Sequence, residues 1–270
     1  MKLSQPLSMM AAAPELAQFA CTESGAAVTL RIFGKRLKAA AAPLILYFHG
    51  GLFNCGSVAD ADSLAQALAA HAVVVCVDYP LAPELRFPQT VELAFEALQW
   101  AWSHAAALGA DAARIIVGGD QAGGNLAAAV ALLARDRSVP NRPPLKAQCL
   151  ITPMLDPFQT TPSMRAACDC PCRKGWADYL PRAGDAMHPY ASPLNSRRLG
   201  GLAAALIITA ERDPLRDEAE QYAAKLIAAG VPVQVRRFDG AGNLASAEHE
   251  QFTAVSAAIA QFVAESAAES

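Results

Sequence analysis

The stretch VGGDQAGGNLAAAVALLA (residues 117–134) predicts a buried strand, a tight turn and a helix in direct succession. Gly119 and Gly123 bracket the turn, and glycine is the residue that tolerates sharp backbone reversals and close backbone approach. Gln121 occupies the centre of the turn, so a carboxamide lies where the strand passes into the helix.

Apolar runs and helical periodicities alternate along the rest of the chain. The periodicity is clear at residues 91–108, where Val91, Phe95, Leu98 and Trp102 recur on one face. Continuous apolar strands separated by helices are typical of a mostly parallel sheet covered on both faces. The sequence therefore predicts an α/β fold. The predicted strands are residues 26–34, 43–50, 73–79, 114–120, 145–155, 204–213 and 231–239, and the predicted helices are residues 64–72, 91–108, 123–136, 217–230 and 246–266.

The length and composition suit a single domain. The chain has 270 residues, of which 53% are hydrophobic, and this allows a large core. We place the domain at residues 25–265 and expect residues 1–24 to form a short, frayed or helical segment. Pro14 and Glu15 interrupt the apolar patch of that segment, which disfavours a signal peptide and favours a cytoplasmic protein.

Charge and hydropathy exclude several classes of partner. The net charge is −3 and no basic stripe is present, so nucleic acid is not an expected partner. No apolar run approaches the roughly 18 residues of a membrane span. No motif indicates a cofactor.

Seven cysteines are present, and three of them stand at alternate positions. Cys168, Cys170 and Cys172 would suit a soft metal, but zinc ligands are usually separated by two to four residues and no histidine is close. We expect an irregular loop with free thiols and no metal. Cys76 and Cys149 lie in apolar runs and are predicted to be core thiols.

Three predicted strands end in unusual polar or glycine-rich segments. HGGLF (residues 49–53) follows one strand, the turn around Gln121 follows another, and ERDPLRDE (residues 211–218) follows a third. Because open parallel sheets place their sites beyond the carboxyl ends of the strands, we predict the functional site there.

The motifs at these strand ends together resemble a known enzyme family. In order, they are PLILYFHGGLFNCG, VVVCVDYPLAPELRFP and VGGDQAGGNLAAA, followed by LDPFQTTPSMR, HPYASPL and ERDPLRDEAEQYAAKL. This series is similar to the hormone-sensitive-lipase family of α/β hydrolases, whose hallmarks are an HGGG turn, a DYRLAPE-like segment and a GDSAGG elbow. The resemblance implies an α/β-hydrolase fold, with helices on both faces of a mostly parallel sheet and a reduced cap.

The resemblance also implies roles for individual residues. Asp213 matches the acid of a Ser-His-Asp triad. Gly50, Gly51 and Ala122 match positions whose backbone N–H groups would stabilise an oxyanion. His49 matches a histidine that holds the oxyanion loop.

Three positions depart from the family pattern. Gln121 stands where the family has its nucleophilic serine, and a carboxamide has no ionisable proton near neutral pH. Asn243 stands at the position of the basic histidine, and Leu52 replaces the third glycine of the HGGG turn. Loss of a catalytic triad lowers the turnover rate by a factor on the order of 10⁶. The joint loss of the serine, the histidine and the third glycine therefore predicts a protein that is no longer selected for hydrolysis.

Other groups near these positions have alternative interpretations. His249 lies six residues beyond Asn243 and could act as a substitute base, but we expect it on the polar surface of the last helix. Cys55 is a possible thiol nucleophile without a clearly placed histidine. Asp120 is expected to hydrogen-bond the surrounding turns, and Asp213 is hypothesised to hydrogen-bond Asn243.

The cap is predicted from an insert at residues 156–194 that is shorter than the family pattern. Trp176, Tyr179 and Leu180 are its expected roof residues. Such a roof would leave the pocket shallow or open, with an apolar patch for self-association or a partner. A small closed lid is the alternative. The pocket is expected to be lined by Leu52, Phe53, Gln121, Asn243 and cap residues such as Trp176.

Three functions remain open from the sequence. The favoured one is a non-hydrolytic pseudoenzyme that binds a small apolar molecule or a protein partner. A residual carboxylesterase for short acyl esters is the second. A repurposed cyclase, lyase or isomerase with Asp213 as its base is the third. The resemblance also implies a possible homodimer through the last strand and the C-terminal helix.

Overall fold

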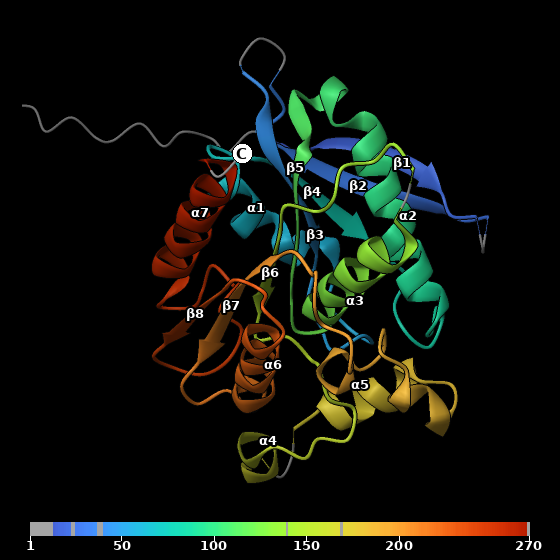
Figure 1. Cartoon of the computed structure of the whole chain (residues 1–270), viewed down its shortest axis with the longest axis vertical. Coiled ribbons are helices and arrows are strands. Elements are labelled where there is room, and N and C mark those ends of the chain that lie inside the picture. Colours follow the sequence, from blue (N-terminus) through green and yellow to red (C-terminus); the bar gives the residue numbers. More distant parts are fainter. Residues whose placement is uncertain (1–12, 23–24, 37–39, 139, 168–169, 269–270) are drawn as a thin grey trace, which may run out of the picture.

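The computed structural model describes the chain except residues 1–12, 23–24, 37–39, 139, 168–169 and 269–270. The strands of the described residues form one sheet in the order β1-β2-β4-β3-β5-β6-β7-β8 (Figure 1). Strands β3 to β8 run parallel to one another, and β2 runs antiparallel to both β1 and β4. The strands are β1 (Glu15–Ala20), β2 (Ala27–Phe33), β3 (Ala42–Phe48), β4 (Val73–Asp78), β5 (Ala110–Asp120), β6 (Ala147–Ile151), β7 (Ala204–Ala210) and β8 (Val233–Phe238).

Helices cover both faces of the sheet, as the sequence predicts. Helices α2, α3 and α6 contribute to one hydrophobic cluster and α1 and α7 to the other. Alternate residues of β3 divide between the clusters: Leu44 and Leu46 enter the first, and Ile45 and Tyr47 enter the second. The helices are α1 (Asp62–Leu68), α2 (Gln89–His104), α3 (Gln121–Arg137), α4 (Pro162–Ala166), α5 (Cys172–Tyr179), α6 (Arg216–Ala228) and α7 (Phe252–Ala268), with 3₁₀ turns η1 (Val58–Ala61), η2 (Ala106–Leu108), η3 (Ala183–Met187) and η4 (Pro193–Asn195).

The N-terminal segment corrects one expectation. Within residues 1–24 a frayed or helical segment is expected, but Glu15–Ala20 forms strand β1 and pairs with β2. Ala17 and Phe19 pack against the core, while Gln18 between them is exposed and donates a hydrogen bond to Thr29. This period of two belongs to a strand, so the sheet begins before residue 25.

The cap insert closes directly onto the loop that follows β3. Phe53 stacks on Tyr179 of α5 with ring centroids 3.9 Å apart, and it also meets Trp176 at 4.9 Å. A Cβ atom at Gly175 would lie 2.1 Å from the carbonyl oxygen of Leu52, so the two backbones touch. Helix α5 therefore packs onto this loop through the aromatic stack, and the shallow or open pocket stays a prediction.

The described cysteines lie in the core, in the cap and, for the exposed Cys55, in the loop after β3. Cys76 and Cys149 are buried core thiols, as predicted. Cys172 begins α5 instead of lying in a loop, and its Sγ is 2.9 Å from that of Cys170. Cys168 lies outside the described residues. Within the part of the chain that the structure describes, no group of three or more His, Cys, Asp or Glu side chains could hold a metal ion.

No helix among the described residues is long and apolar enough to cross a membrane.

Candidate functional site

The turn at Gln121 joins β5 to α3 without an intervening residue. β5 ends at Asp120 and α3 begins at Gln121, which adopts the left-handed φ of 49°. A side chain in this region is strained by roughly 1–2 kcal/mol, which is typical of a strand-to-helix elbow. A Cβ at Gly123 would lie 2.0 Å from the carbonyl oxygen of Phe48, so only glycine fits there.

The carboxamide of Gln121 reaches back to the loop that follows β3. Its Oε1 accepts a hydrogen bond from the backbone N–H of Gly51 at 3.1 Å. Because an N–H can only donate, the oxygen of the amide must be the atom that faces Gly51. The backbone of Gln121 is fixed from the other side, where its carbonyl accepts a hydrogen bond from Met154 N at 3.0 Å.

The loop after β3 is held in an unusual conformation. Gly51, Leu52 and Phe53 all have positive φ, at 108°, 59° and 73°. A Cβ at Gly51 would lie 1.9 Å from the carbonyl oxygen of Cys55, which requires glycine at this position. Leu52, which stands at the predicted third-glycine position, is partly buried and contacts Gly175 of α5.

His49 begins this loop and is buried. Its Nδ1 lies 2.8 Å from the carbonyl oxygen of Gly50, so Nδ1 carries the proton of a neutral ring. The ring stacks on Tyr79 at 4.3 Å, and the Tyr79 hydroxyl donates to the carbonyl of His49 at 2.7 Å. Burial lowers the pKa of His49. Nε2 has no hydrogen-bond partner among the described residues.

Asp120 lies behind the elbow and binds the surrounding turns, as predicted. It accepts a hydrogen bond from the Tyr47 hydroxyl at 2.8 Å, and its Oδ2 lies against Gly50, where a Cβ would be 2.1 Å away. Burial raises the pKa of Asp120 to about 6, against the opposing effect of the Tyr47 hydrogen bond.

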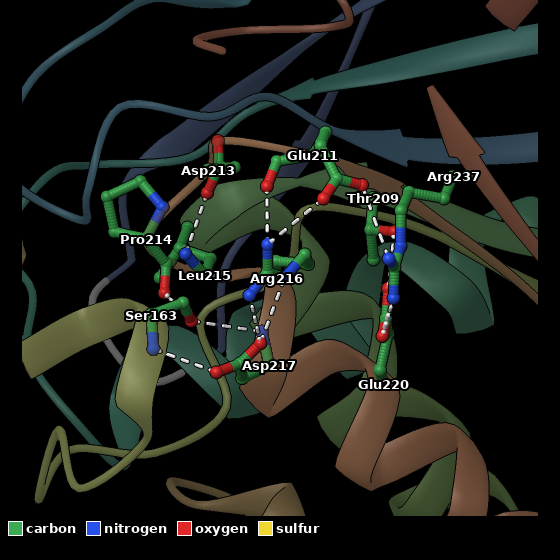
Figure 2. A network of polar contacts seen from close by, with 10 residues as sticks. All are labelled: Ser163, Thr209, Glu211, Asp213, Pro214, Leu215, Arg216, Asp217, Glu220 and Arg237. Carbon is green, nitrogen blue, oxygen red and sulfur yellow. Dashed lines mark hydrogen bonds and ion pairs between the residues drawn. The ribbon is translucent and has the colours of Figure 1, made fainter. Parts of the chain in front are cut away.

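Asp213 follows β7 at the start of the turn into α6, and Figure 2 shows its surroundings. Its Oδ1 accepts a hydrogen bond from the backbone N–H of Leu215 at 2.7 Å. Burial raises the pKa of Asp213 to about 6. The nearby arginines pair with other carboxylates: Arg216 with Glu211 and Asp217, and Arg237 with Glu211 and Glu220 (Figure 2). Within the described ranges, Asp213 forms no ion pair.

The hypothesised hydrogen bond between Asp213 and Asn243 is wrong. Asn243 Oδ1 instead accepts from the backbone N–H of Ala245 at 2.9 Å, and no bond joins these two side chains in the described structure. Each of them caps the backbone two residues further on, a local arrangement that Asp and Asn favour.

His249 does not lie on the last helix, because α7 begins at Phe252. Its Nδ1 accepts a hydrogen bond from Gln251 N at 3.1 Å, and its Nε2 lies 3.2 Å from the carbonyl oxygen of Ala241. These contacts hold His249 within the connection between β8 and α7. The predicted helix-surface position is therefore wrong, because the helical periodicity of residues 246–266 extends beyond the helix itself.

A cavity of about 490 Å³ lies beside the elbow. It brings together the predicted residues Gln121, Asn243, His49, Gly50 and Gly51. Its wall is polar and includes three carboxyl groups, with neither lysine nor arginine among the lining residues that the structure describes. The full lining is His49, Gly50, Gly51, Cys55, Gly56, Ala59, Asp60, Ser63, Asp120, Gln121, Asn243, Ser246, Ala247 and Glu248.

Other predicted site residues do not line this cavity. Phe53 and Trp176, at 1% and 4% exposure, are packed in the hydrophobic cluster, and Ala122 is also buried. Leu52 and Asp213 are likewise not part of the wall.

No sequence motif points to Asp60, Ser63 or residues 246–248, which also line the cavity. The only signal was their position, since they follow the HGGLF segment and Asn243 in the chain.

Comparisons with known proteins agree with this architecture. A sequence model of the α/β-hydrolase fold family matches residues 45–243. An arylesterase of Saccharolobus solfataricus is 37% identical over 206 residues, which are 73% of this chain and 66% of that protein. The carboxylesterase NlhH of Mycobacterium tuberculosis is 39% identical over 206 residues, 72% of this chain and 63% of its own length. The chain thus spans less than two thirds of these two curated relatives.

Solved structures give the same result. A hyperthermophilic esterase from the archaeon Pyrobaculum calidifontis superposes with a TM-score of 0.84 at 35% identity, covering 94% of this chain and 83% of that one. A bacterial heroin esterase superposes with a TM-score of 0.86 at 31% identity, covering 97% and 86%. The chain therefore belongs to the α/β-hydrolase fold family and is similar to esterases within it.

Proposed function

We propose that this chain is a non-hydrolytic member of the family, which uses the cavity at Gln121 to bind a ligand. The hydrogen bond from Gly51 N–H to Gln121 Oε1 carries this proposal. In an ester hydrolase, a loop N–H of this kind stabilises the oxyanion of the transition state. Here Gln121 Oε1 already accepts a hydrogen bond from this N–H, so a substrate carbonyl would have to displace the Gln121 amide.

The residues at the predicted triad positions support the same conclusion. The carboxamides of Gln121 and Asn243 neither attack a carbonyl readily nor accept a proton near neutral pH. Asp213 retains its carboxylate, but it binds its own turn through Leu215 N. An acid at this position serves a triad by orienting a histidine, and asparagine takes the place of that histidine.

The cavity wall supports a polar ligand better than the apolar one that the sequence favours. Carboxylates, amides and hydroxyls surround Gln121, while the aromatic side chains of Phe53 and Trp176 are buried in packing below α5. A buried polar group requires a hydrogen-bond partner, so an apolar molecule would leave these groups unsatisfied.

Ester hydrolysis through another group is the second candidate, because the similar proteins described above are esterases. Cys55 is the available nucleophile at the cavity. Its thiol donates to the carbonyl of Gly51 at 2.8 Å, and burial raises its pKa, which disfavours the reactive thiolate. Among the described residues, no histidine hydrogen-bonds this thiol.

The test is hydrolysis of p-nitrophenyl acetate and butyrate by the purified protein beside three variants. These are Gln121→Ser, Asn243→His and the double variant, each checked for folding by circular dichroism. We expect no turnover above a heat-treated control for the unmodified protein or the single variants, and measurable turnover for the double variant. Saturable turnover by the unmodified protein overturns the proposal, and its loss on Cys55→Ala would identify the thiol as the nucleophile.

A further inference from the structure

Two cysteine side chains meet in the cap, outside the cavity at Gln121. Cys170 Sγ lies 2.9 Å from Cys172 Sγ, and the two thiols share a hydrogen bond. A disulfide bond joins its sulfurs at about 2.05 Å, so the contact places the pair within reach of oxidation to a disulfide. Neither cysteine belongs to the described lining of the cavity at Gln121, so the proposed function does not use this pair.

The two thiols differ in their access to solvent. Cys170 is partly exposed and lines a separate cavity of about 190 Å³. Cys172 is the first residue of α5, is 3% exposed and packs in the hydrophobic cluster. Burial, and then the hydrogen bond with Cys170, raise the pKa of the Cys172 thiol. Because the thiolate is the reacting form of cysteine, a reagent that enters the cavity reacts with Cys170 first.

The cavity at Cys170 is positively charged. Arg165 and Arg173 belong to its wall, and no carboxylate does among its described lining residues. Within the described ranges, neither arginine forms an ion pair. Guanidinium groups bind carboxylates through charge-assisted hydrogen bonds, so this wall attracts an anionic reagent to the thiol. The other described lining residues are Gln159, Met164 and Ala167.

We propose that Cys170 and Cys172 are a redox-active pair that small anionic disulfides oxidise at this cavity. The Cys170 thiolate attacks one sulfur of the disulfide R–S–S–R, the S–S bond breaks, and the released RS⁻ takes up the proton that Cys170 lost. Cys172 then loses its proton and attacks Cys170 Sγ, which breaks the mixed disulfide, and the second RS⁻ takes up that proton. Two protein thiols are thereby oxidised to one disulfide, and R–S–S–R is reduced to two molecules of RSH.

The test follows oxidation of the reduced full chain by three disulfides of similar size and different charge. 3,3′-Dithiodipropionate is anionic, bis(2-hydroxyethyl) disulfide is neutral and cystamine is cationic. Each rate constant is divided by that of the free thiol N-acetylcysteinamide, because the leaving thiol sets the intrinsic rate. We expect a normalised rate about tenfold higher for the anionic than for the neutral disulfide, from about threefold for each arginine, and the lowest rate for cystamine. High salt should reduce these differences, because exposed charges are screened.

Mass spectrometry identifies the product in the full-length variant Cys168→Ser, beside the unmodified chain. Trypsin cleavage after Arg165 and Arg173 gives a peptide of residues 166–173, in which the variant keeps only the thiols of Cys170 and Cys172. We expect the anionic disulfide to remove two hydrogen atoms from this peptide without adding its own mass. The exposed Cys55 is the internal control, and it should carry a mixed disulfide instead.

Further variants assign the roles of the side chains. Arg165→Gln and Arg173→Gln should each lower the rate of the anionic disulfide about threefold, the size of an exposed charge contact. Lys174→Gln is the matched control, because Lys174 is exposed and next to Arg173 but does not line the cavity. Cys172→Ser should stop at the mixed disulfide on Cys170, and Cys170→Ser should leave Cys172 unreacted. Thermal unfolding midpoints establish that each variant folds.

Three results overturn the inference. The first is a peptide of residues 166–173 that keeps both thiols, or carries only a mixed disulfide, while Cys55 reacts. The second is an equal normalised rate for the three disulfides. The third is an equal loss of rate on Lys174→Gln, because the effect would then follow the overall charge of the chain. None of the reagents is an ester, so these outcomes are independent of the hydrolysis that tests the proposed function.

Discussion

Gln121 Oε1 accepts a hydrogen bond from the backbone N–H of Gly51 at 3.1 Å, and this contact joins the elbow to the loop after β3. Gln121 adopts φ 49°, so the strained backbone aims the amide back across the carboxyl ends of β3 and β5. The side chain is therefore part of the structure of the site. It keeps a backbone donor occupied that an esterase would leave free for its substrate.

Gln121→Ala should free the Gly51 amide. The substitution removes one hydrogen bond with a net worth of about 1 kcal/mol, so hydrogen exchange at Gly51 should accelerate about fivefold. The Cys55 amide, which donates to Gly51 O at 2.9 Å, is the internal control. Exchange measured by NMR should change at Gly51 alone, and equal acceleration at both amides would instead indicate loosening of the whole loop.

Gly123→Ala should destabilise the protein severely. The new Cβ would lie 2.0 Å from the carbonyl oxygen of Phe48 and 2.4 Å from that of His49, and neither backbone can move without disturbing β3 or the loop. We expect a loss of more than 3 kcal/mol in the free energy of urea unfolding, which is larger than most substitutions cause. Gly184→Ala is the matched control, because a Cβ there meets nothing within 4 Å. Similar stability of both variants would contradict the tight packing at the elbow.

The sequence predicted the parallel sheet well because its strands are continuous apolar runs and its elbow depends on local glycines. It missed β1, where Ala17 and Phe19 give only a faint alternation in an alanine-rich segment. The packing of the cap on the loop after β3 could not be predicted, because the stack of Phe53 on Tyr179 joins residues far apart in the chain. The sequence shows which residue types stand at the candidate site, but it does not show their hydrogen-bond partners.

Asp213 and Asn243 illustrate this limit. The resemblance brings the two positions together, yet each side chain has a backbone N–H two residues ahead of it, at Leu215 and Ala245. Such local bonds compete with a long-range pair and cost less conformational entropy to form. Side-chain identity therefore does not predict which hydrogen-bond partner Asp213 or Asn243 takes.

Two buried tyrosines should respond differently to loss of their hydroxyls. Tyr47 donates to Asp120 at 2.8 Å, whereas the Tyr179 hydroxyl has no hydrogen-bond partner within the described ranges. Tyr47→Phe leaves a buried carboxyl without this donor and should cost about 1–3 kcal/mol. Tyr179→Phe removes an unsatisfied group and should be neutral or stabilising. Urea unfolding of both variants at pH 7 measures this, and an equal cost would contradict the assigned contacts.

The raised pKa of Asp213 should make its contribution to stability depend on pH. Burial raises this pKa from 3.8 to about 6 in the folded state, so folding favours the protonated acid. The contribution of Asp213 to the free energy of unfolding is greatest below about pH 4, where the acid is protonated in both states. This contribution is lost as the pH rises through about 6 and the buried carboxyl ionises. Asp213→Asn removes this titration and can keep the hydrogen bond from Leu215 N.

The Asp213→Asn variant should therefore gain stability over the unmodified protein between pH 4 and pH 7.5. The raised pKa of Asp213 corresponds to at most about 3 kcal/mol in the free energy of unfolding. Because this carboxyl is buried, we expect the variant to gain a large part of that amount. Urea unfolding at a series of pH values measures the difference. Asp239→Asn, at an exposed carboxylate, is the control for removal of a negative charge that is not buried. A flat profile for Asp213→Asn would show that water reaches this carboxyl in solution and that its burial does not govern its ionisation.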